Sequence, residues 1–90
     1  MKREEIEQAM KEAFIASLQD FSKHHPATWA ALCRKANNNP AQFIWDQLQQ
    51  DKDYQALLNQ TGGEIKAAQI LRIAMSAIFK FAPLLLGAVT

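Results

Sequence analysis

The most constraining feature of this 90-residue chain is the apolar segment that closes it. From Ile70 to Val89 the plainly polar side chains are Arg72, Ser76 and Lys80. On a helix between Glu64 and Ala82 the polar side chains, Lys66, Gln69, Arg72, Ser76 and Lys80, would fall within about 120° of arc, because successive residues turn by about 100°. The other two thirds of that helix would be apolar, which is more surface than a helix at the edge of a small monomer can cover.

Two arrangements satisfy this pattern. The helix either runs through the centre of a bundle or buries its second apolar side against another chain. We expect the second arrangement, and with it a homodimer or higher homo-oligomer, because burying each Ile, Leu or Phe contributes about 1.5 to 3 kcal/mol. The predicted interface consists of Ile70, Ile73, Ala77, Ile78, Phe81, Leu84 and Leu85.

Local signals predict where this helix begins and ends. Thr61 and Glu64 match a capping box, so we expect the helix to begin near Gly62. Pro83 is expected to bend or end it, because proline lacks a backbone donor and clashes with the preceding turn. The apolar tail over 83–90 would then pack on the bundle or at the oligomer interface.

A membrane span by the same segment is not favoured. The gain from its apolar side chains is offset by Arg72 and by Lys80 in mid-span, which alone costs about 2.5 to 3.5 kcal/mol. At the other end of the chain, residues 1–7 lack the apolar stretch of a secretory signal. We therefore expect a cytoplasmic protein that does not enter the membrane.

The whole chain, 1–90, predicts a single all-α domain. We expect a compact bundle of four to five helices, with long first and last helices and short helices between them. Apolar side chains three or four residues apart predict the first helix over 3–23. The predicted core consists of Ile6, Met10, Phe14, Leu18, Trp29, Leu32, Ile44, Leu48, Leu57, Ile70 and Phe81.

Three short helices are expected in the middle of the chain. Pro26 suits the first turn of a helix over about 27–36. Asn39 is the expected N-cap of a helix over 40–50, with Pro40 as its first residue. A fourth helix, capped near Asp51, is expected around 54–58.

Composition excludes several classes of function. Ten Lys and Arg against nine Asp and Glu leave a net charge of +1, far below the excess with which dedicated nucleic-acid binders neutralise phosphates. Cys33 is the only cysteine, which rules out an intramolecular disulfide and a cysteine-rich zinc module. Asp20 and His24 lie one helical turn apart, but a His at a helix C-terminus is favoured by the dipole without any metal. We expect a protein that is not an enzyme and has no cofactor or metal.

The helix over 40–50 carries the most concrete surface for a protein partner. Phe43 projects opposite the apolar side of this helix, among uncharged amides. The expected partner-binding residues are Gln42, Phe43, Asp46, Gln47 and Gln50. We therefore expect a small interaction or adaptor module that self-associates through its last helix and offers this surface to another protein.

A dimeric helix-turn-helix regulator of DNA is the alternative. The segment 28–45 resembles that motif, with two short helices joined by an Asn-rich turn. The DNA-binding residues would be Arg34, Lys35, Asn39, Gln42 and Gln49. The second helix has no Lys or Arg, and Asp46 lies on the side that would meet DNA, so protein interaction is favoured. The sequence alone leaves the alternative open.

Overall fold

In the computed structural model, described over residues 2–60 and 65–87, the chain forms five helices and no strand within those ranges. They are α1 (Arg3–His24), α2 (Pro26–Lys35), α3 (Pro40–Gln49), α4 (Lys52–Leu58) and α5 (Ala67–Gly87). The predicted all-α class, with long first and last helices and short ones between, is confirmed. The ends of the first four helices lie within two residues of their predicted positions.

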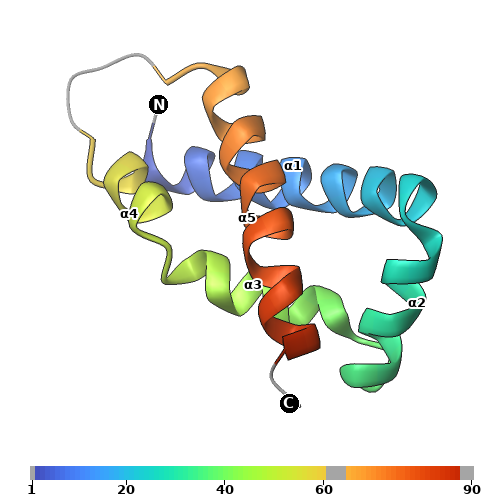
Figure 1. Ribbon diagram of the computed structural model, residues 1–90. Helices are drawn as coiled ribbons and strands as arrows, with labels where there is room; N and C mark the ends of the chain where they lie inside the picture. The colour runs from blue at the N-terminus through green and yellow to red at the C-terminus, as the bar shows by residue number, and fades with distance from the viewer. Residues whose placement is uncertain (1, 61–64, 88–90) are drawn as a thin grey trace.

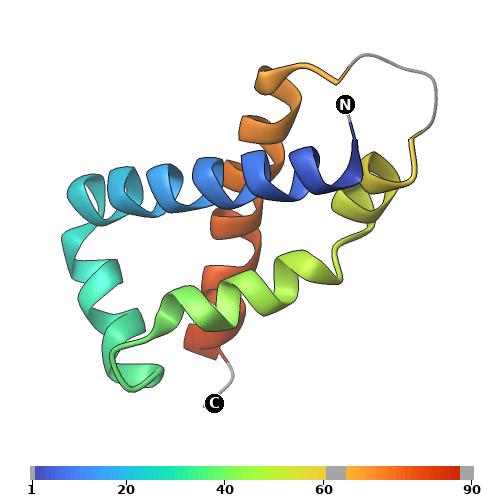
Figure 2. The ribbon, with the colours of Figure 1, turned by 180° about the vertical axis from the view of Figure 1, so that it is seen from behind.

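The helices are arranged in two layers. α1 and α3 run across one layer, with α2 joining them at one end and α4 at the other, and α5 crosses over both (Figure 1). The opposite view places α1 and α3 in front of α5 (Figure 2). The molecule is flat, with principal extents of 43 × 24 × 16 Å. One side of α5 therefore rests on the other helices, and its other side faces outward.

A single cluster of apolar side chains fills the space between the layers. The stripe predicted on α1 is buried, from Ile6 to Phe21. α5 contributes Ile70, Ala74, Ala77, Ile78, Phe81, Ala82 and Leu85. The predicted core is confirmed, with Trp29 half-buried at the edge of the cluster and the other members buried.

The turn between α2 and α3 follows from its asparagines. Asn37 and Asn38 have φ angles of 51° and 65°, in the left-handed region that Asn tolerates better than most residues. The Asn39 side chain accepts a hydrogen bond from the Gln42 backbone N–H at 3.4 Å, as expected of an N-cap. The Gln42 side chain does not complete a capping box, because it donates to Asp46 Oδ1 at 2.8 Å.

The predicted start of α5 near Gly62 is wrong. Residues 61–64 lie outside the described residues, but Ile65 and Lys66 are not helical and the helix begins at Ala67. Gln69 Oε1 accepts a hydrogen bond from the Lys66 backbone N–H at 2.8 Å, which is the bond that the third residue of a capped helix makes. Ile65 is buried before the helix begins, so core packing fixes this segment in a non-helical conformation.

Pro83 does not end α5, which continues to Gly87. A proline inside a helix removes one backbone hydrogen bond and crowds the preceding turn. Ala82 and Leu85, on either side of it, are buried in the core, and this burial offsets the cost of continuing the helix. The first five residues of the predicted tail are therefore helical, and residues 88–90 lie outside the described residues.

A tertiary ion pair fixes the polar side of α5. Asp51 occupies the N-cap position of α4, but its side chain makes no cap hydrogen bond. Instead, Lys80 Nζ donates to Asp51 Oδ1 at 2.6 Å, and the Asp51 side chain is buried. The hydrogen bond and the negative charge of Asp51 raise the pKa of Lys80. Asp51, which the sequence predicts as a local cap of α4, therefore makes a long-range contact with α5 instead.

Replacing Asp51 with Asn should lower the melting temperature at neutral pH. Because the pKa of Lys80 is raised on folding, the pair contributes fully below the ordinary lysine pKa of about 10.4 and is lost as the pH rises through the raised value. When melting curves are recorded at several pH values, the difference in melting temperature between wild type and Asp51→Asn should become smaller in that alkaline range. Asp53→Asn is the comparison, because this exposed carboxylate of the same helix raises the pKa of Lys80 less than Asp51 does, so its removal should lower the melting temperature less. Equal effects of the two substitutions would contradict the assignment.

Tyr54 carries a polar atom that the core does not satisfy. Its side chain is fully enclosed, and its hydroxyl has no hydrogen-bond partner among the described residues. Burial raises the pKa of this phenol, and the nearby charge of Glu7 raises it further. The hydroxyl is thus desolvated without compensation.

Tyr54→Phe should therefore stabilise the fold, by about 1 kcal/mol, because it removes an unsatisfied buried hydroxyl and keeps the ring. Urea denaturation of the two proteins measures the change in the free energy of unfolding. A loss of stability in the variant would mean that the hydroxyl is hydrogen-bonded in solution.

Candidate functional site

The outer side of α5 exposes a row of large apolar side chains, which we call the α5 stripe: Leu71, Met75 and Phe79. Their exposed fractions are 44%, 41% and 55%. Spacing of four residues places them on one side of the helix. Figure 1 shows why they are uncovered, since α5 lies on one face of the layer formed by the other helices. A contiguous apolar row of this kind is typical of an interaction surface.

The residues predicted for the oligomer interface lie mainly on the opposite side of the helix. Within the described chain, Ile70, Ala77, Ile78, Phe81 and Leu85 are buried in the core. Ile73 is half-buried, and Leu84 is 53% exposed. The helical periodicity correctly predicted which sides of α5 are apolar. It could not distinguish the side that α1 and α3 cover from the side that stays exposed.

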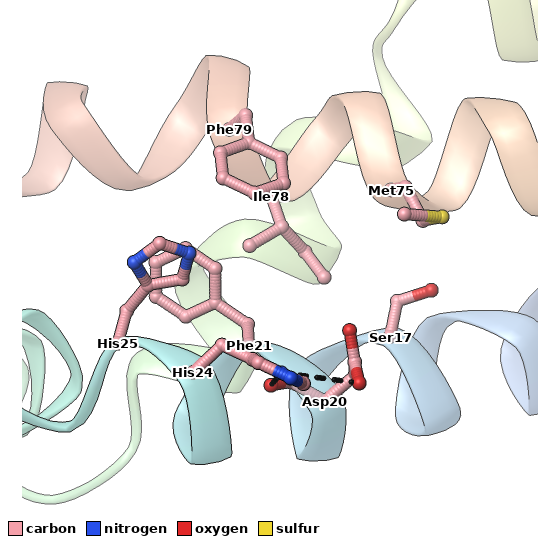
Figure 3. Close-up of a pocket in the computed structure, with 8 residues that line it drawn as sticks. All are labelled: Ser17, Asp20, Phe21, His24, His25, Met75, Ile78 and Phe79. Carbon is pink, nitrogen blue, oxygen red and sulfur yellow. Dashed lines mark hydrogen bonds and ion pairs between the residues drawn. The ribbon is translucent and has the colours of Figure 1, made fainter.

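Beside the stripe, a pocket of about 450 Å³ opens between the C-terminal half of α1 and the middle of α5. Figure 3 shows α1 contributing one wall and α5 the other. The lining residues are Ser17, Asp20, Phe21, His24, His25, Met75, Ile78 and Phe79. This volume lies in the range of about 300 to 1,000 Å³ that is typical of small-molecule sites.

Three rings gather at one end of this pocket. Phe21 and Phe79 meet edge to face, with centroids 5.4 Å apart. His25 tilts against Phe21 at 4.8 Å and meets Phe79 edge to face at 5.9 Å. A second depression, of about 230 Å³, lies on the far side of the same rings, toward Pro83 and Leu86. Phe79 is thus the side chain shared by the stripe and both depressions.

The polar groups of the pocket come from α1 and from His25, which follows it. His24 Nδ1 lies 2.9 Å from the Asp20 carbonyl oxygen and 3.3 Å from Asp20 Oδ1, and both side chains are well exposed. The histidine is therefore held by its own helix end, as its position predicts. Cys33 is half-buried on α2. Within residues 2–60 and 65–87, no three His, Cys, Asp or Glu residues are grouped closely enough to hold a metal ion.

Ser17 adds an unsatisfied polar atom to the same wall. The residue is 7% exposed, and its hydroxyl oxygen has no hydrogen-bond partner in the part of the chain described. Ser17 and Asp20 lie three residues apart, so both face α5 from one side of α1. In Figure 3 the carboxylate oxygen of Asp20 that does not contact His24 points toward α5, whereas the Ser17 hydroxyl is turned along α1, away from Asp20.

The surface predicted on α3 lacks its central anchor. Phe43 is half-buried and packs against the core instead of projecting into solvent. Gln42 is bound to Asp46, while Gln47 is half-buried and Gln50 is exposed. The helical projection assumed one buried side, whereas α3 also contacts α2, α4 and α5. The expected partner remains a prediction without this anchor.

The DNA-binding residues of the alternative are only partly accessible. Arg34 and Lys35 are exposed at the end of α2. Asn39 caps α3, and Gln42 is tied to Asp46. Gln49 is half-buried, with its amide nitrogen enclosed and unpartnered among the described residues, so that it cannot reach a base edge. The geometry therefore adds no support to DNA binding.

The chain matches no known protein family model, no curated protein and no solved structure. Within the described residues, α5 is the one helix long and apolar enough to cross a membrane, with a mean hydropathy of 1.7 over its most apolar window. Within the fold, 39% of that window is buried, and core helices of soluble proteins are also long and apolar enough to meet this criterion.

Adjacent residues on α5 should lose very different amounts of stability on the same substitution. Ile78→Lys should abolish cooperative folding, because Ile78 is 1% exposed and a charge there has no partner. Phe79→Lys should reduce the free energy of unfolding by no more than about 1 kcal/mol, because the ring is half exposed. Thermal unfolding followed by circular dichroism measures both. A similar loss in both variants would mean that the α5 stripe is covered within the chain.

Proposed function

We propose that this protein is a small non-catalytic interaction module that self-associates through the outer side of α5. The observation that carries the proposal is the α5 stripe, in which three large apolar side chains remain 41% to 55% exposed on the most apolar helix of the fold. Exposed apolar surface of this extent is removed from water by association. The proposed interface is therefore the side of α5 that the core leaves uncovered, and not the side that the sequence favoured.

The stripe is suited to a second copy of itself. Leu71 and Phe79 lie at equal distances in sequence from Met75, so two antiparallel copies of α5 place Met75 at the two-fold axis. Leu71 of one copy then packs against Phe79 of the other, as a self-complementary interface requires. A formal charge of +1 gives the copies little reason to repel each other.

The expected association is weak to moderate. Each side chain of the stripe is already about half covered, so its burial contributes roughly half of the 1.5 to 3 kcal/mol of full burial. Lost translational and rotational freedom opposes association by several kcal/mol. A dissociation constant in the micromolar range or weaker follows, which makes the oligomeric state dependent on concentration.

Sedimentation over a range of concentrations should show a monomer–dimer equilibrium for the wild-type protein. Leu71→Lys and Phe79→Lys should each shift it to monomer, because a desolvated ammonium at the interface has no partner. Ile15→Lys is the control, since Ile15 is 47% exposed on α1 and lies beside Trp45, away from the stripe.

Two results would overturn the proposal. One is a wild-type protein that stays monomeric up to millimolar concentration. The other is that the Leu71→Lys and Phe79→Lys variants associate as strongly as the Ile15→Lys variant. Co-sedimentation with phosphatidylcholine–phosphatidylglycerol vesicles forms a further arm, since α5 is apolar enough to meet a membrane. A monomer that binds these vesicles through the stripe would replace self-association with membrane contact.

A further inference from the structure

We infer that a fall in pH dissociates the proposed dimer, and that His25 is the group that responds. This inference rests on the proposed function, because it concerns the regulation of the α5 stripe. Its basis is a difference between two neighbouring histidines. His24 is paired with a carboxylate, whereas His25 packs against an aromatic ring of the stripe. Imidazoles change charge between about pH 5 and 8, so a fall in pH across that range places a positive charge at one edge of the stripe.

His25 lies at the edge of the stripe, in contact with Phe79, the most exposed of its three members. The two rings meet edge to face with centroids 5.9 Å apart, and the His25 ring also tilts against Phe21 at 4.8 Å. Figure 3 shows the three rings together at one end of the pocket. His25 is itself exposed, and it lines the same two depressions as Phe79. A second copy that covers Phe79 therefore also removes water from His25.

The two histidines differ in what compensates their positive charge. His24 Nδ1 lies 3.3 Å from Asp20 Oδ1, so protonation of His24 completes an ion pair on α1. The His25 ring has no hydrogen-bond or ion-pair partner among the described residues. In Figure 3 the Asp20 carboxylate lies beside His24, at the other end of the pocket from the His25 ring. A protonated His25 is therefore stabilised mainly by water, which the dimer removes.

The other charged groups on the helices around His25 do not offset its charge. Lys23 precedes it by two residues at the end of α1 and is also positive. α2 carries charge only in its last turn, as the cations Arg34 and Lys35. On α5, Lys80 is a cation that the buried carboxylate before α4 already binds. Within the monomer, these helices therefore bring no unpaired acid to the imidazole.

The second copy brings further positive charge to this end of the stripe. In the antiparallel pairing proposed above, Leu71 of one copy packs against Phe79 of the other. Arg72 follows Leu71, is exposed, and has no ion-pair partner in the described part of the chain. Between Ala67 and Gly87, α5 has no acidic side chain. Protonated His25 thus opposes association through lost hydration and like charge, and a two-fold interface contains this arrangement twice.

Sedimentation of the full chain at about pH 8 and about pH 5.5 tests the inference. The dissociation constant of the wild-type dimer should rise about tenfold at the lower pH. His25→Gln should lose most of this dependence, because the glutamine side chain does not titrate. His24→Gln is the matched control and should keep the dependence. Comparing the two pH values within each variant removes the effect that the substitution itself has on association.

A second pair of variants supplies the charge permanently. At about pH 8, His25→Lys should associate about tenfold more weakly than His24→Lys, because only the first places an ammonium group beside Phe79. Both histidines are exposed, so neither substitution should prevent folding. Circular dichroism of every variant at both pH values checks that the helices are retained.

The outcomes separate this inference from the proposed function. A dimer that is equally strong at both pH values, or stronger at the lower one, would overturn the inference and leave the proposed function standing. A pH dependence that persists in His25→Gln would assign the effect to another group, and would overturn the inference as well. A wild-type protein that stays monomeric at both pH values would contradict the proposed function and this inference together.

Discussion

The packing of α5 across α1 and α3 is the contact on which the rest of the structure depends. α1 and α3 meet at Phe14 and Trp45, whose ring centroids are 5.1 Å apart, and α5 covers the remaining apolar surface between them. Ala74 and Ala77 are buried at the centre of α5, where small side chains permit close approach between helices. Larger side chains toward the helix ends, such as Ile70 and Phe81, fill the wider spaces on either side.

This packing also creates the exposed surface. The other four helices of the described chain all lie on one side of α5, so the helix that completes the core also carries the stripe. Ile78 and Phe79 illustrate the result, since these neighbours in sequence are 1% and 55% exposed. Core formation and an open apolar side are therefore consequences of one arrangement. A function based on the stripe requires no specialised loop or additional element.

Polar groups set the position of α5 at two levels. Asp51 holds Lys80 on one side of the helix, through a bond between residues 29 positions apart. On the side toward α1, Ser17 and Asp20 face α5 across the pocket, and no described group of α5 pairs with them. The first contact stabilises the layer arrangement.

The sequence by itself determined the helices, because their signals are local. Spacing of apolar residues along α1, the Asn37–Asn39 turn and the Asn39–Pro40 start of α3 each act within a few residues, and the structure follows them. Even the core could be predicted, since one apolar side of each helix has to be buried. The start of α5 and its continuation through Pro83 could not, because burial of Ile65 and Leu85 decided them.

Tertiary structure alone decided which residues form the candidate site. Periodicity gave α5 more apolar directions than one core can cover, but only the position of α1 and α3 selected Ile78 for the core and Phe79 for the surface. The same holds for Phe43, which other helices cover. Helical geometry fixes directions around one axis, whereas exposure depends on neighbours that are distant in the sequence.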